Sequence, residues 1–130
     1  MAKVIGLGGV FFKSQDPAAI KKWYIDHLGL PEAEDPDDPG ISFKNSAQPA
    51  SGFSVWGPFK ADTQYFDPAT REFMINLVVD DLDGVLQQVE KGGGTIVGDI
   101  EEYDFGRFGW FMDPDGNKVE LWQAIAPQGA

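Results

Sequence analysis

Residues 111–122 read FMDPDGNKVELW, and the structure expected for this stretch decides the fold. Its centre, DPDG at 113–116, predicts a tight turn, because proline fixes φ at the second turn position and glycine accepts a positive φ. Apolar and polar residues alternate beside the turn, which is typical of strands with one buried face. Residues 107–123 are therefore predicted to form an antiparallel hairpin.

A strand and a helix are predicted before this hairpin. Residues 75–79 (INLVV) are mostly apolar, and either of the two aspartates after them can cap the first turn of a helix. Apolar side chains recur at helical spacing over 82–89, and the three glycines at 92–94 end the helix. A further strand is predicted at 95–97, so this half of the chain reads β-α-β-β-β.

The first half of the chain has the same order. Residues 10–15 predict a strand, Asp16 caps a helix that follows, and Gly29 ends that helix. Strand-like runs come next at 41–44 and 52–56. Asp16 and its counterpart Asp81 lie half a chain length apart, which indicates an internal repeat.

Two such units predict a single domain over 1–130, since a chain of this length forms one core. The repeats are expected at about 4–57 and about 73–123. The connector between them, 58–72, carries three aromatic residues and is expected to pack on another part of the molecule.

Composition excludes several classes of protein. The chain has 10 basic and 21 acidic residues, a net charge of −11, one histidine and no cysteine. Its charge repels phosphate backbones and anionic lipid, so we expect neither a nucleic acid nor a membrane partner. No apolar run approaches the roughly 20 residues of a membrane span, and the first residues lack a signal-peptide pattern. We therefore expect a cytoplasmic protein.

Three motifs carry a family resemblance: KWYIDHLGL at 22–30, VDDLD at 79–83, and the hairpin sequence at 111–122. In this order they resemble the vicinal oxygen chelate superfamily, which includes glyoxalase I, bleomycin resistance proteins and extradiol dioxygenases. The resemblance implies an α+β fold in which two tandem βαβββ repeats form a curled mixed sheet. The sheet would surround an open cavity, with the helices on its convex side.

The resemblance also tests for a metal site, because metal-dependent members take ligands from the first and last strands of each repeat. Only Glu120 matches a ligand position of the family. The other positions fall near Gly9, at Ser54 or Val55, and near Met74. A catalytic divalent ion needs about three or four protein donors, so no metal cofactor is expected. The single histidine, at a helix end, also argues against a dioxygenase.

Strand alternation assigns residues to the cavity. Val119 and Leu121 are expected under a helix, which turns Glu120 and Trp122 to the opposite face, and the same argument turns Asn76 there. Glu120 is predicted as a general base, a ligand-binding carboxylate or a member of a structural ion pair. Asn76 is predicted to bond a ligand, a neighbouring strand or water. The residues expected to bind ligand are Asn76, Met74, Phe11, Trp56, Tyr103, Arg107 and Trp122.

These features favour a metal-free module that binds an apolar or aromatic small molecule in a cleft completed by a second chain, as a homodimer. The alternative is a glyoxalase-type lyase or isomerase that uses Glu120 with a divalent metal. The sequence leaves open whether the protein is an enzyme.

Overall fold

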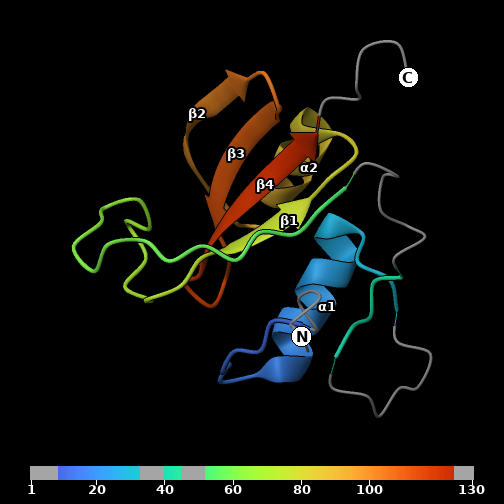
Figure 1. Cartoon of the computed structure of the whole chain (residues 1–130). Coiled ribbons are helices and arrows are strands. Elements are labelled where there is room, and N and C mark those ends of the chain that lie inside the picture. The colour runs from blue at the N-terminus through green and yellow to red at the C-terminus, as the bar shows by residue number, and fades with distance from the viewer. Residues whose placement is uncertain (1–8, 33–39, 45–51, 125–130) are drawn as a thin grey trace, which may run out of the picture.

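The computed structural model describes residues 9–32, 40–44 and 52–124, which form an α+β fold with a four-stranded mixed sheet and two helices (Figure 1). Neither helix of this described part is long and apolar enough to cross a membrane. The elements in chain order are α1 (Pro17–Leu28), β1 (Ile75–Val78), α2 (Leu82–Lys91), β2 (Thr95–Tyr103), β3 (Gly106–Met112) and β4 (Lys118–Ala124).

Both helices begin and end as their sequences predict. The side chain of Asp16 accepts a hydrogen bond from the backbone N–H of Ala19 at 3.0 Å, and Gly29 ends α1 in the left-handed region with φ 69°. The side chain of Asp81 accepts from Gly84 N–H at 3.1 Å at the start of α2. These caps pair backbone groups that have no partner inside a helix.

The predicted hairpin is confirmed. β3 and β4 pair antiparallel on either side of the turn, and the strand order is β1-β4-β3-β2, with β1 parallel to β4. One prediction falls short, because β2 runs on to Tyr103 and does not stop at residue 97. Its pairing with β3 is irregular between Val97 and Glu101, where Gly98 has φ +70°. Such a bulge interrupts the ladder without ending the strand.

The core lies between the helices and one face of the sheet. Val119 and Leu121 are fully buried there, as the alternation of β4 predicts. The core residues are Ile20, Tyr24, Leu82, Val85, Val89, Phe111, Val119 and Leu121. Glu120 and Asn76 consequently face away from the helices.

The strands predicted in the first half are not confirmed. Residues 10–15, 41–44 and 52–56 contain no strand, and residues 4–8, 33–39 and 45–51 of the first repeat lie outside the described residues. A strand needs a neighbour to pair its backbone groups, and in the described residues these segments pair with neither edge of the sheet. Their large side chains are left exposed, with 94% of Phe11 and 80% of Trp56 accessible.

Candidate functional site

Glu120 is the centre of a polar cluster on the open face of the sheet. Its carboxylate accepts hydrogen bonds from the Tyr65 hydroxyl at 2.5 Å, the Asn76 side-chain amide at 2.7 Å and the Trp110 indole at 2.9 Å. Asn76 on β1 and Trp110 on β3 are the direct strand neighbours of Glu120, so the register itself brings them together. Tyr65 comes from the connector.

Lys118 lies beside this carboxylate, on the same face of β4. Only 7% of the residue is exposed, and its ammonium donates to the Tyr65 backbone carbonyl at 2.5 Å. The ammonium also lies 5.1 Å from the Tyr65 ring centroid and 5.9 Å from that of Trp110. Burial lowers the pKa of Lys118, while the negative charge of Glu120 acts in the opposite direction. A cation and a carboxylate therefore share one aromatic-lined site.

Tyr65 is held as a neutral hydrogen-bond donor. Burial, and then its hydrogen bond to Glu120, raise the pKa of the Tyr65 hydroxyl above its ordinary value. Its ring is stacked on Phe59, with the centroids 5.5 Å apart, and Phe66 packs on Phe59 at 5.1 Å. The aromatic residues of the connector thus form a cluster that anchors Tyr65 over the sheet.

The pKa of each of the three tyrosines of the chain is raised in the folded state. Burial raises the pKa of Tyr24, burial also raises that of Tyr65, and the charge of Glu101 raises that of Tyr103. A pKa raised on folding gives stability that is present below the unfolded value, near pH 10, and lost as pH rises through the folded value. Ultraviolet titration should therefore show less tyrosinate at pH 10 in folded protein than in urea. Equal amounts of tyrosinate at pH 10 in folded protein and in urea would contradict this expectation.

An aromatic wall adjoins Glu120 on the same face; we define it as Phe53, Tyr103, Phe105, Phe108 and Trp122. Phe108 and Trp122 are stacked with their planes 5° apart and centroids 6.0 Å apart. Phe53 packs edge-on against Trp122, and Tyr103 stacks on Phe105. The Trp122 indole donates to the Phe105 carbonyl at 3.1 Å, which holds the loop after β2 on the wall.

The structure gathers some of the predicted site residues and separates others. Asn76, Trp122 and Tyr103 share the open face with Glu120. Arg107 faces the helices, where it forms ion pairs with Asp83 at 2.9 Å and Glu102 at 3.1 Å.

The other predicted ligand contacts lie outside the four strands. Met74 is half-buried just before β1, and Phe11 and Trp56 are exposed in segments without regular structure.

Three residues of the cluster were not predicted. Lys118 follows from the same alternation that places Glu120, and Trp110 follows from the hairpin register. The sequence signal for Tyr65 is weaker, since it marks the residue only as one of three aromatic residues in a connector that is expected to pack on another part of the molecule. It lies 55 positions from Glu120 along the chain.

The described residues do not form a donor set for a catalytic divalent ion. They hold no group of three or more histidine, cysteine, aspartate or glutamate side chains that could bind one. The Glu120 carboxylate is engaged by three N–H or O–H donors, which are not metal ligands. His27 lies on α1, and its ring lies 5.5 Å from that of Trp23 on the helical side of the molecule.

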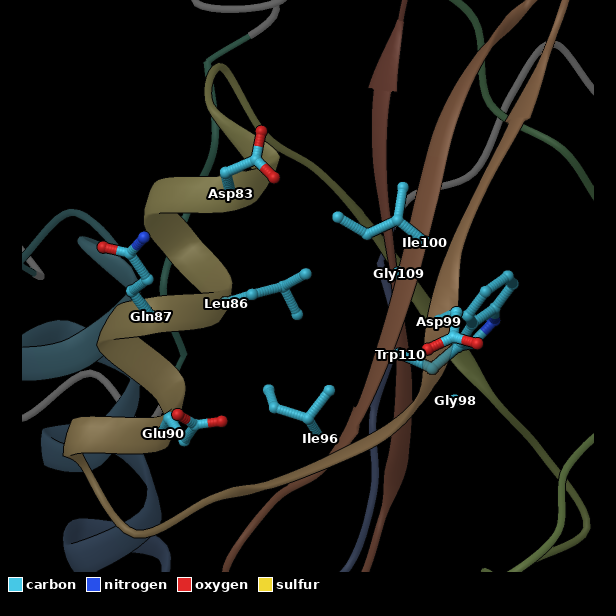
Figure 2. Close-up of a pocket in the computed structure, with 10 residues that line it drawn as sticks. All are labelled: Asp83, Leu86, Gln87, Glu90, Ile96, Gly98, Asp99, Ile100, Gly109 and Trp110. Carbon is cyan, nitrogen blue, oxygen red and sulfur yellow. The ribbon is translucent and has the colours of Figure 1, made fainter.

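A cavity of about 370 Å³ opens on the other side of the sheet, between α2 and β2 (Figure 2). Leu86 and Ile96 point into it from opposite walls, and Asp83, Glu90 and Asp99 lie around it. Only Trp110 is shared with the Glu120 cluster. The cavity lies beside the β2 bulge at Gly98. On the opposite face, three hydrogen bonds converge on the Glu120 carboxylate. We take the Glu120 face as the candidate site.

Comparison with known proteins places the chain among glyoxalase-like proteins. The chain is 31% identical over 127 residues to CFP32 of Mycobacterium bovis and Mycobacterium tuberculosis, whose curated name describes a candidate glyoxylase. The match covers 93% of this chain and 46% of CFP32, so the chain spans about half the length of the curated relatives it matches.

Solved structures share the fold. A protein from the mobile metagenome of V. pseudocholerae is similar with a TM-score of 0.58 at 20% identity, over 97% of this chain and 99% of that one. TnmS3 of Streptomyces sp. CB03234, titled an antibiotic binding protein, is similar with a TM-score of 0.50 at 21% identity, over 85% and 88%. Residues 9–121 match the family that the sequence motifs resemble. The chain belongs to the Glyoxalase/Bleomycin resistance protein/Dioxygenase superfamily.

Proposed function

We propose that this chain binds an apolar or aromatic small molecule on its open sheet face, without a metal. One observation carries the proposal: the Glu120 carboxylate, with three hydrogen-bond donors on it, adjoins an aromatic wall of which Phe53 and Phe105 are more than half exposed. Flat apolar surface beside a few convergent polar groups is the usual composition of a small-molecule site. TnmS3, an antibiotic binding protein with a similar fold, offers a parallel for this kind of activity.

A second copy of the chain would complete this site. Exposed aromatic side chains on one face are costly to leave in water and mark binding or association surfaces. The sheet also keeps β1 and β2 as edge strands, which can pair with another chain. We therefore include a homodimer in the proposal, with the ligand held between the wall of one protomer and its partner.

The alternative function is a glyoxalase-type lyase or isomerase. Glu120 matches a ligand position of metal-dependent relatives, and the name of CFP32 refers to that chemistry. This function needs donors beyond those that the described residues bring to Glu120. About one divalent ion per chain in protein purified without chelator would favour it.

Binding to the aromatic wall can be measured with the neutral fluorescent probe N-phenyl-1-naphthylamine. We expect its fluorescence to rise on binding and its affinity to fall about tenfold in Phe105→Ala, because the lost ring removes stacking area. Phe105 is 59% exposed, so the substitution should leave the fold intact. Phe43→Ala is the matched control, since Phe43 is also exposed and lies outside the wall.

The helix-side cavity is tested in the same titration. Glu90→Gln changes that cavity without touching the open face, and it should leave probe affinity unchanged. An effect of Glu90→Gln without one of Phe105→Ala would move the site to the helix side. Absence of probe binding at any concentration below its solubility would reject the proposed function.

A further inference from the structure

Tyr65 occupies the open face much as a bound phenol would. Its hydroxyl donates to Glu120 Oε2, its ring meets the Trp110 ring edge-on with centroids 6.2 Å apart, and the Lys118 ammonium lies over its face. The residue keeps 38% of its surface exposed, so solvent reaches this contact. A carboxylate acceptor, an aromatic edge and a cation over the ring are the contacts that recognise a hydroxyaryl group.

The three donors on Glu120 differ in how firmly they are held. Asn76 and Trp110 belong to the strands on either side of β4 and are tied to Glu120 by register. Asn76 uses Oε1, and Trp110 shares Oε2 with Tyr65. Tyr65 belongs to a connector with turns but no strand, so movement of its side chain breaks ring contacts with Phe59 and Trp110 but no hydrogen bond between strands. With Asn76 on Oε1 and Trp110 on Oε2, the carboxylate keeps a free acceptor direction on Oε2 for a third donor.

We propose that Tyr65 holds the place of a ligand's hydroxyaryl group, and that the site binds a neutral phenolic small molecule in exchange for Tyr65. The ligand hydroxyl donates to Glu120, its ring lies between Trp110 and Lys118, and the rest of the ligand extends over the aromatic wall. This inference rests on the proposed function and names the class of ligand.

The geometry predicts that the site prefers a phenol to the methyl ether of the same phenol. A phenol supplies the proton that Glu120 accepts, whereas a methyl ether of the same shape presents only lone pairs to a carboxylate. A site built around a hydrogen bond rejects an analogue that cannot make it, because its own polar group is left unpaired. Negative charge on Glu120 likewise disfavours a phenolate or carboxylate at this position.

The test compares 2-naphthol with its methyl ether, 2-methoxynaphthalene. We expect 2-naphthol to bind Tyr65→Ala about tenfold more tightly than it binds wild type, because the competing phenol is gone. The preference for 2-naphthol over the ether should fall about tenfold in Tyr65→Ala/Glu120→Gln relative to Tyr65→Ala, since the hydrogen bond loses its charged acceptor. Phe43→Ala is the control, because Phe43 is exposed, lies outside the aromatic wall, and its loss should leave this preference unaltered.

The outcomes separate this inference from the proposed function. Equal binding of naphthol and ether to Tyr65→Ala overturns the phenol inference, and so does weaker naphthol binding to a folded Tyr65→Ala, which a structural Tyr65 would cause. If N-phenyl-1-naphthylamine still binds in either case, the proposed function stands. If that probe also fails to bind wild type, the proposed function itself is rejected. Tyr65→Phe, which keeps the ring and loses only the hydroxyl, repeats the test if Tyr65→Ala does not fold.

Discussion

Replacing Asp113 with alanine is expected to lower the free energy of unfolding by about 4 kcal/mol, because several buried donors lose their acceptor together. Asp113 is 6% exposed and begins the turn between β3 and β4. Its carboxylate accepts from the Tyr24 hydroxyl at 2.7 Å and the Asn117 side chain at 2.9 Å. It also accepts from the backbone N–H groups of Asp115 and Asn117. The residue therefore ties the turn to α1.

Urea unfolding monitored by circular dichroism measures this effect, and two variants divide it. Tyr24→Phe removes only the link to α1 and should cost about 1–2 kcal/mol. Asp113→Asn keeps the shape and one oxygen acceptor, and we expect a loss between those of the other two variants. If Asp113→Ala cost less than about 1 kcal/mol, the turn would be holding its shape without the carboxylate.

Replacing Trp110 with alanine is expected to cost about 3 kcal/mol of stability, as truncation of a large buried aromatic does. Trp110 is 6% exposed although it lies on the face opposite the helices. Tyr65 packs edge-on against it, and its indole donates to Glu120 at 2.9 Å. The connector is thus expected to protect Trp110 from water in solution.

Trp110→Phe separates packing from hydrogen bonding. Phenylalanine retains most of the apolar contact and loses the indole N–H, so we expect a loss of about 1 kcal/mol. Both variants are compared with wild type by urea unfolding, using the far-ultraviolet signal of the helices. If Trp110→Ala lowered the free energy of unfolding by no more than Trp110→Phe does, the connector would not cover Trp110.

Local features of the fold could be predicted from the sequence because their causes lie within a few residues. Asp16 and Gly29 bound α1 through hydrogen bonds and a left-handed φ that neighbouring residues supply. The turn at 113–116 and its hairpin follow from proline and glycine chemistry in the same way. Alternation then placed Glu120 and Asn76 on one face, since Val119 and Leu121 require the core.

Pairing between distant segments was beyond these rules. The strands expected at 41–44 and 52–56 did not form in the described residues, because strand propensity acts only when a neighbouring strand completes the hydrogen bonds. Arg107 was expected near Glu120. Arg107 lies instead on the helix-side face, where it forms ion pairs with Asp83 on α2 and Glu102 on β2.

The sequence by itself determined the helices, the hairpin and the face on which Glu120 lies, since each depends on spacing within one element. Only the tertiary structure decided what Glu120 meets. Register in the sheet brought Asn76 and Trp110 to it, and the path of the connector brought Tyr65. No periodicity links Tyr65 to Glu120, because a connector has no fixed repeat and its side chains point where packing of the whole chain directs them.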